Sequence, residues 1–229
     1  MKTSIEEYKE IIQWDVKSWS KALHFWEKNV KWENVKTCLE LGSREGGLSL
    51  WLAQKKKNVV CSDYENTEIT AHKLHKKYGV EAQIAYVDID ATNIPFENHF
   101  DIIVFKSIIG GIGYNNNLEA QQLVFAQIHK ALKPGGKLLF AENLIASPLH
   151  IYFRNKFIKW GSSWRYINAI EMRQFLKDFK NVELKSTGFL ATFGRNETQR
   201  TVFHYFDKYL FNWLFPANWK YIIYGFAEK

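Results

Sequence analysis

A glycine-rich stretch, ELGSREGG at residues 40–47, stands between an apolar run and a run with helical periodicity. A glycine turn at that place lets the backbone approach a bound nucleotide closely, and the start of a helix offers free N–H groups. Asp63 ends the next apolar run, where a carboxylate can accept hydrogen bonds from both hydroxyls of a ribose. These features predict a nucleotide-type cofactor without identifying it, because dinucleotide enzymes use a similar arrangement.

Two further motifs narrow the choice. Asp90 and Ala91 begin the stretch DATNIPF after a third apolar run, where the carboxylate can accept a hydrogen bond from an adenine amino group. The stretch ALKPGG, residues 131–136, precedes a fifth apolar run. With these features in this order over roughly residues 35–143, the sequence resembles the class I S-adenosylmethionine-dependent methyltransferases, especially their small-molecule (methyltransferase type 11-like) family.

The resemblance implies S-adenosylmethionine as the cofactor, S-adenosylhomocysteine as its product, and no metal. S-adenosylmethionine has no phosphate and carries cationic amino and sulfonium groups, so Glu40 favours it, whereas Glu40 and Glu45 would repel a pyrophosphate. Arg44 stands where relatives have a glycine, and its side chain can either reach the methionyl carboxylate or obstruct the pocket. The residues expected to contact the cofactor are Glu40, Gly42, Ser43, Arg44, Gly46, Asp63, Tyr64, Asp90, Ala91 and Lys106.

Methyl transfer is an in-line displacement at a carbon that the sulfonium already activates, so the protein must chiefly align donor and acceptor. Such positioning supplies roughly 7–11 kcal/mol. A hydroxyl acceptor also needs a base; His150 is the first candidate, with Lys106, Tyr114 and His204 behind it. Relatives often carry a histidine where this chain has Gly110-Gly111, so that base is absent.

The charge distribution favours an anionic acceptor. The chain has 31 basic and 24 acidic residues, a net charge of +7, and most of that excess lies in residues 150–200. Arg154, Arg165 and Tyr166 lie in this region, and arginine suits phosphate or carboxylate because its planar fork bonds two oxygens at once. We therefore expect a small anionic metabolite such as a sugar, a nucleotide-linked sugar or a phosphorylated compound, with O-methylation slightly favoured over N-methylation.

Four alternatives stay open. The basic region can dock RNA or a protein for methylation, although the chain has no recognisable nucleic-acid module, which makes nucleic acid the weaker choice. Arg44 can fill the cofactor site, which would leave a non-catalytic module that retains the fold. The aromatic stretch at residues 202–215 suggests a membrane-surface role, but ordinary packing explains it better. A nicotinamide-dependent oxidoreductase is supported only by the glycine loop.

A doubly wound α/β sheet would bring these residues together. Short apolar runs alternate with helical periods, which is the pattern of βαβ units and a mainly parallel sheet. The resemblance implies a Rossmann-like sheet of seven strands with the last one antiparallel. Strands are expected at residues 35–41, 58–63, 84–89, 100–105, 137–143, 182–192 and 219–228, and helices at 47–56, 67–78, 118–132 and 167–179.

The 229 residues are expected to form a single methyltransferase domain. Residues 1–34 would be a helical cap, residues 35–143 the cofactor-binding core, and residues 144–229 the acceptor-side insertions and terminal strands. We expect residues 144–165 to be irregular. The aromatic side chains in these additions are expected to belong to ordinary core.

The two cysteines, Cys38 and Cys61, lie inside predicted strands and fit neither a disulfide framework nor a zinc site. We expect them to be inert. The first residues lack the apolar stretch of a signal peptide, and no apolar run is long enough to span a membrane. The sequence therefore predicts a cytoplasmic protein without a membrane span, and it leaves the oligomeric state undetermined.

Overall fold

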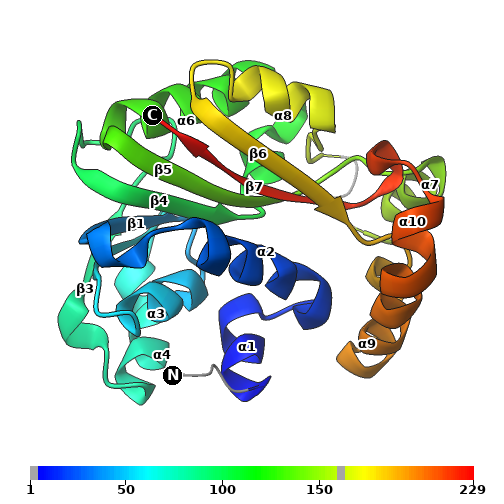
Figure 1. The fold of residues 1–229 in the computed structure, drawn as a ribbon, viewed down its shortest axis with the longest axis horizontal. Helices are drawn as coiled ribbons and strands as arrows, with labels where there is room; N and C mark the ends of the chain where they lie inside the picture. The colour runs from blue at the N-terminus through cyan, green and yellow to red at the C-terminus, as the bar shows by residue number, and fades with distance from the viewer. Residues whose placement is uncertain (1–4, 159–162) are drawn as a thin grey trace.

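A seven-stranded sheet forms the centre of the molecule in the computed structural model, which describes residues 5–158 and 163–229 (Figure 1). The strand order is β3-β2-β1-β4-β5-β7-β6, and neighbouring strands are parallel except in the two pairs that include β7. The expected doubly wound sheet with an antiparallel last strand is confirmed. The strands are β1 (Thr37–Leu41), β2 (Asn58–Asp63), β3 (Ile84–Asp88), β4 (Phe100–Lys106), β5 (Leu132–Asn143), β6 (Lys180–Thr187) and β7 (Ile222–Glu228).

Helices cover both faces of this sheet. One face carries α1 (Ile5–Ile12), α2 (Val16–Asn29), α3 (Gly47–Ala53) and α4 (Thr67–Lys77), and the other carries α5 (Ile109–Ile112), α6 (Leu118–Ala131) and α8 (Ala169–Phe175). Consecutive strand residues point to opposite faces, so the apolar strands feed two separate cores. Cys38 in β1 belongs to the core under α2 and α3, whereas its neighbour Leu39 belongs to the core under α6 and α8.

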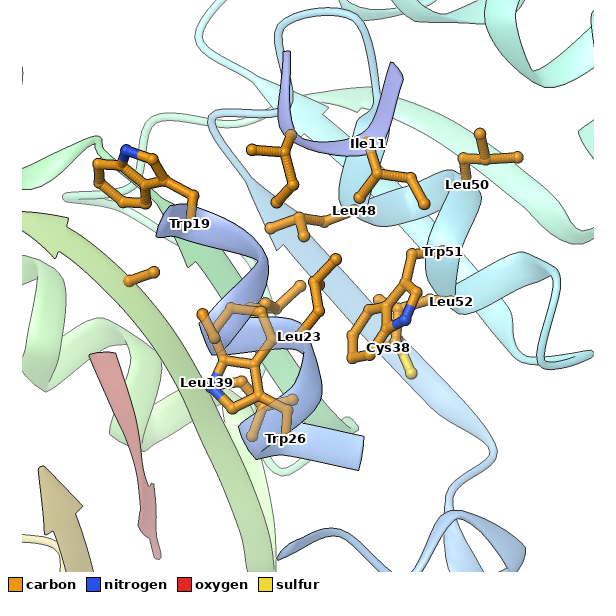
Figure 2. Close-up of a cluster of buried hydrophobic side chains, with 14 of the residues drawn as sticks. Ile11, Trp19, Leu23, Trp26, Cys38, Leu48, Leu50, Trp51, Leu52 and Leu139 are labelled. Atoms are coloured by element: carbon orange, nitrogen blue, oxygen red, sulfur yellow. The ribbon is translucent and has the colours of Figure 1, made fainter. Parts of the chain in front are cut away.

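The N-terminal helices are part of the first core. Trp19 and Trp26 of α2 are each only 1% exposed, and Trp26 lies beside Leu23 and 5.8 Å from the Trp51 ring of α3, measured between ring centres (Figure 2). The indole Nε1 of Trp26 donates a hydrogen bond to the carbonyl oxygen of Gly225 in β7 (2.8 Å). The expectation that these aromatic residues pack as ordinary core is confirmed for α2.

The cysteines are also core residues. Cys38 in β1 and Cys61 in β2 are free and buried. Burial raises the pKa of both thiols to about 12, so neither forms a reactive thiolate at neutral pH.

The segment after β5 differs from the expectation. Residues 144–165 were expected to be irregular, but they contain α7 (Pro148–Phe157), which begins with proline in the first turn, where its missing N–H costs no hydrogen bond. The helix expected at 167–179 is shorter: Asn168 and Glu171 form a capping box that begins α8 at Ala169, and α8 ends at Phe175. β6 ends at Thr187, before the expected 192, where the N–H of Gly188 leaves the sheet and donates to Asn212 Oδ1 (2.9 Å).

The insertion between β6 and β7 is helical. It consists of α9 (Glu197–Phe206), a π-helix (Asp207–Phe211) and α10 (Asn212–Leu214). The expectation that its aromatic residues pack as ordinary core is wrong for one side of these helices: Trp213, for example, is 85% exposed. Within the described residues no helix has the length and apolarity needed to cross a bilayer.

The contrast between the two kinds of tryptophan gives a test of this fold. We expect Trp26→Phe to lower the free energy of unfolding by about 1–3 kcal/mol, because it removes buried atoms and leaves the Gly225 carbonyl without its donor. Trp213→Phe, at an exposed position, should change it by less than about 0.5 kcal/mol. Urea unfolding followed by circular dichroism measures both; equal losses would contradict the placement of α2 against β7.

Candidate functional site

Two carboxylates at the ends of β1 and β2 hold the glycine loop in place. Glu40 is buried, and its two oxygens accept hydrogen bonds from Leu48 N (3.2 Å) and Ser49 N (2.6 Å) in the first turn of α3. Asp63 accepts a hydrogen bond from Arg44 N (2.7 Å) in the loop itself. These bonds satisfy backbone donors that a helix start leaves free, and they fix the path of the loop beside Asp63.

The same device recurs at two other strand ends. Asp88 ends β3 and accepts a hydrogen bond from Thr67 N (2.9 Å) at the start of α4, which follows β2. Glu142 in β5 accepts one from Ile109 N (2.8 Å) at the start of α5, which follows β4. A carboxylate on one strand thus fixes the segment that leaves the neighbouring strand. Sequence reasoning missed Asp88 and Glu142, although an acidic residue ending an apolar strand was the available signal.

The backbone is unusual where the chain leaves β1, β4 and β5, which are neighbours in the sheet. Gly42 has a φ of +65°, and a Cβ there would lie 2.3 Å from Cγ2 of Ile108. Arg44 (φ +50°), Ser107 (φ +58°) and Ala146 (φ +61°) adopt the same left-handed region. That region costs an ordinary L residue roughly 1–2 kcal/mol, and such strain commonly collects at functional sites.

The residues expected to contact the cofactor lie along one edge of the sheet. Residues 90–91 follow β3, residues 63–64 lie at the end of β2, the glycine loop follows β1, and Lys106 ends β4, in the strand order β3-β2-β1-β4. Tyr64 is 72% exposed, whereas Ser43 Oγ is buried and has no hydrogen-bond partner among the described residues. Their contacts with a cofactor stay a prediction. No group of His, Cys, Asp and Glu in residues 5–158 and 163–229 is placed to hold a metal ion.

Lys106 has the electrostatic environment of a reactive amine. Its half-buried ammonium lies 5.2 Å from the centre of the Trp19 ring and makes no hydrogen bond or ion pair with the described residues. Burial, together with the positive charge of Arg44, lowers the pKa of Lys106 to about 8. Burial raises the pKa of Glu40 and Glu142, which lie on the two neighbouring strands, to about 7. The lowered pKa brings Lys106 closer to neutral pH, which is the range that suits a general base.

The environment of His150 contradicts its expected role as the base. It is 3% exposed; its Nε2–H donates to the carbonyl oxygen of Phe189 (2.8 Å), and its Nδ1 accepts from Ser147 Oγ (2.7 Å). Burial lowers the pKa of His150 to about 4, so the ring stays neutral with both nitrogens occupied. His204 is similar: it is buried against Ser18 Oγ (3.1 Å), and burial lowers its pKa to about 4.

The three residues expected to bind the acceptor line one cavity of about 540 Å³ beyond the end of β5. Arg154, on α7, lies with its guanidinium 3.6 Å from the centre of the Tyr166 ring. It donates to the carbonyl oxygens of Leu144 (3.1 Å) and Ile145 (3.3 Å), and no carboxylate in the described residues pairs with it. Arg154 therefore keeps donors and an uncompensated positive charge at the cavity wall.

Arg165, in contrast, is already neutralised. Its guanidinium forms an ion pair with Glu171 and donates to Gln121 Oε1 (2.7 Å). The expectation that Arg165 binds an anionic acceptor does not fit this pairing, and Arg154 is the better candidate. Tyr114 is 52% exposed and lies close in sequence to Asn116, which lines the same cavity.

Trp164 packs against the paired glycines of α5. Its ring lies over Gly110 and Gly111, and a Cβ on Gly110 would lie 3.0 Å from Cε3 of that ring. Trp164 also lines the cavity with Arg154. Sequence reasoning missed Trp164; the paired glycines were the signal that a large side chain from elsewhere approaches there.

Comparison with known proteins bears on what this edge of the sheet does. The methyltransferase domain family matches residues 39–140, which contain the glycine loop, Asp63, Asp90 and Lys106. Over residues 39–140, somewhat less than half of its length, the chain is therefore similar to this methyltransferase family. Among curated proteins, the domain resembles the ubiquinone/menaquinone biosynthesis C-methyltransferase UbiE of Shewanella, with 32% identity over 106 residues, covering 45% of this chain. The match covers only 39% of that relative's length.

Solved structures extend the likeness of the methyltransferase fold to nearly the whole chain. A phosphoethanolamine N-methyltransferase of Haemonchus contortus, in complex with S-adenosylmethionine, aligns with 98% of this chain and 56% of its own (TM-score 0.67, 18% identity). A putative methyltransferase of Bacillus halodurans aligns with 92% of this chain and 99% of its own (TM-score 0.63, 16% identity). At these identities the likeness is one of fold.

The buried His150 gives a test that separates structure from catalysis. A neutral His150 with a pKa of about 4 stabilises the fold fully above the ordinary histidine pKa, and this stability is lost as pH falls toward 4. At pH 7 we expect His150→Phe to be less stable than the wild type by about 1–3 kcal/mol, because Ser147 and Phe189 lose their partner.

This difference should shrink as the pH is lowered from about 6.5 to 4, because only the wild type must then protonate a buried ring. Urea unfolding at several pH values measures it, with His99→Phe at an exposed histidine as the control. A difference that stays constant across this range would contradict the buried, neutral state of His150.

Proposed function

We propose that this chain transfers a methyl group from S-adenosylmethionine to a small anionic acceptor. One observation carries the proposal: within a methyltransferase domain, the loop after β1 is fastened to Asp63, and Lys106 ends the adjacent strand β4. The activity and the acceptor are proposals, because the curated relatives match over only part of their length and the solved structures share only the fold.

The residues along the carboxyl edge fit the groups of this cofactor. Asp63 accepts from Arg44 N through one oxygen and from Tyr64 N (2.8 Å) through the other, and each oxygen keeps a second lone pair for a ribose hydroxyl. Ser43 Oγ is a buried polar atom without a partner among the described residues. Asp90 is exposed, and its Oδ2 makes no hydrogen bond with the described residues, so it can accept from an adenine amino group.

When bound, S-adenosylmethionine supplies a methyl group activated by its sulfonium. The protein's part is to hold the acceptor in line with that methyl group and to remove a proton where the acceptor atom is a hydroxyl. Lys106 ends β4, the strand between β1 and β5, and its lowered pKa suits it to take that proton. This arrangement favours O-methylation, with Lys106 in the role expected first for His150.

The acceptor cavity supports an anionic group on the substrate. Arg154 offers a guanidinium group without a carboxylate partner in the described residues, and the ring of Tyr166 stacks on that group. The Haemonchus contortus structure has also been solved with phosphomonomethylethanolamine and S-adenosylhomocysteine, which is compatible with a phosphorylated substrate here. The UbiE relatives are named as C-methyltransferases, so the methylated atom is proposed from Lys106 rather than from likeness.

Calorimetric titration with S-adenosylmethionine and S-adenosylhomocysteine tests the cofactor. We expect Asp63→Asn to weaken binding about 10- to 100-fold, because one charged acceptor for the ribose hydroxyls is lost. Glu65→Gln removes the same charge from an exposed position two residues away and should leave the affinity within about twofold. Absence of binding by folded wild-type protein would overturn the proposal and favour a non-catalytic module with Arg44 in the pocket.

A panel of phosphorylated sugars, nucleotide-linked sugars and phosphorylated amines tests the acceptor through release of S-adenosylhomocysteine. With an active acceptor from this panel, we expect Arg154→Gln to raise KM about 10- to 100-fold with a smaller change in kcat, because a charge-assisted contact to the anion is lost. Arg173→Gln, at an exposed arginine of α8, is the matched control. An unchanged KM in Arg154→Gln would contradict the assigned role of this arginine.

A further inference from the structure

Helix α7 turns apolar side chains toward solvent. Leu149, Tyr152, Phe153 and Phe157 follow one another at helical spacing and are between 38% and 63% exposed. The opposite side of the same helix, with Ile151 and Arg154, lines the acceptor cavity. A surface helix of a globular protein normally turns its apolar stripe inward, whereas the stripe of α7 stays largely exposed in the described part of the chain.

The insertion between β6 and β7 exposes a longer stripe of the same kind. Its members recur at spacings of three and four from α9 through the π-helix to α10, and each is between 46% and 85% exposed. They are Val202, Tyr205, Phe206, Tyr209, Leu210, Trp213 and Leu214. The inner side of these helices packs on the protein through His204 and Asp207, which are buried, so the outward stripe is a second apolar side.

The two stripes belong to the same end of the molecule, where Figure 1 draws α7 and α10 beyond the same end of β6 and β7. Both pack on the segment that follows β6: Phe153 of α7 lies 5.4 Å from Phe193, and His150 lies 4.7 Å from Phe193 and 5.0 Å from Phe189, measured between ring centres. Phe189 in turn stacks on Phe215, just beyond α10, at 4.2 Å. We call the exposed residues of both stripes the aromatic surface.

The exposed charge of the aromatic surface is positive. Lys156 of α7 lies over the rings of Tyr152 and Phe157 (5.5 and 5.6 Å), and Lys208 lies over the ring of Tyr209 (5.0 Å). Residues 148–158 and 202–220 contain one acidic residue, Asp207, which is buried and accepts hydrogen bonds from backbone N–H groups. Long basic side chains among aromatic rings can extend their charge past the rings to a polar layer.

We propose that the aromatic surface docks on a membrane that contains anionic phospholipid. Exposed tryptophan, tyrosine, phenylalanine and leucine beside lysine suit the boundary between acyl chains and anionic headgroups. A second copy of this chain fits less well: in a two-fold interface the surface would meet itself, bringing Lys156 and Lys208 against like charges with no exposed carboxylate from either segment to pair with them.

Co-sedimentation with vesicles tests the proposal without cofactor or acceptor, so its outcome is independent of the proposed activity. We expect the wild type to sediment with vesicles of equal parts phosphatidylglycerol and phosphatidylcholine, and much less with phosphatidylcholine alone. The double variant Phe157→Ser/Trp213→Ser removes one exposed ring from each stripe and should weaken partitioning at least about tenfold.

A matched control replaces exposed apolar residues outside the aromatic surface. Ile69→Ser/Ile170→Ser changes residues that are 81% and 70% exposed on α4 and α8, and it should sediment like the wild type. Failure of the wild type to sediment, or equal loss in the control variant, would overturn the proposal. So would a wild-type dimer in analytical ultracentrifugation that the Phe157→Ser/Trp213→Ser variant dissociates without any vesicle binding by either protein.

Discussion

Carboxylates at the ends of the strands bind the backbone N–H groups that the chain leaves free as it departs from the sheet. Asp63 of β2 holds the loop after β1, Asp88 of β3 holds the start of α4, and Glu142 of β5 holds the start of α5. Glu40 does the same for α3. Because unpaired donors at a buried helix start are costly, these few side chains fix the segments that leave β1, β2 and β4.

The burial of Glu40 and Glu142 also determines the electrostatics of the site. Glu40 and Glu142 have raised pKa values because water is excluded from them, and the same exclusion lowers the pKa of Lys106. The N-terminal and C-terminal additions are joined by related contacts: Glu197 of α9 accepts hydrogen bonds from the N–H groups of Asp15 and Val16, where α2 begins. Glu197 thus fixes the start of the helix that carries Trp19, whose ring lies beside Lys106.

Helix α7 connects the two proposals of this work. One side of it presents Ile151 and Arg154 to the acceptor cavity, and the other side contributes to the aromatic surface. His150, between them, is locked by Ser147 and Phe189 and fixes the rotation of the helix about its axis. A histidine that orients α7 in this way accounts for a buried, neutral ring better than a role in proton transfer.

The sequence by itself determined the alternation of strands and helices, the glycine loop and the acidic residue at the end of β2, because these depend on local periodicity and on neighbours in the chain. Only the tertiary structure decided the roles of His150 and Arg165, and whether the apolar stripe that ends at Leu214 is buried or exposed. Their partners come from distant segments: Phe189 occupies one nitrogen of His150, and Glu171 neutralises Arg165. The spacing of a helical stripe likewise records that one side is apolar, but whether that side faces core or solvent depends on what packs against it.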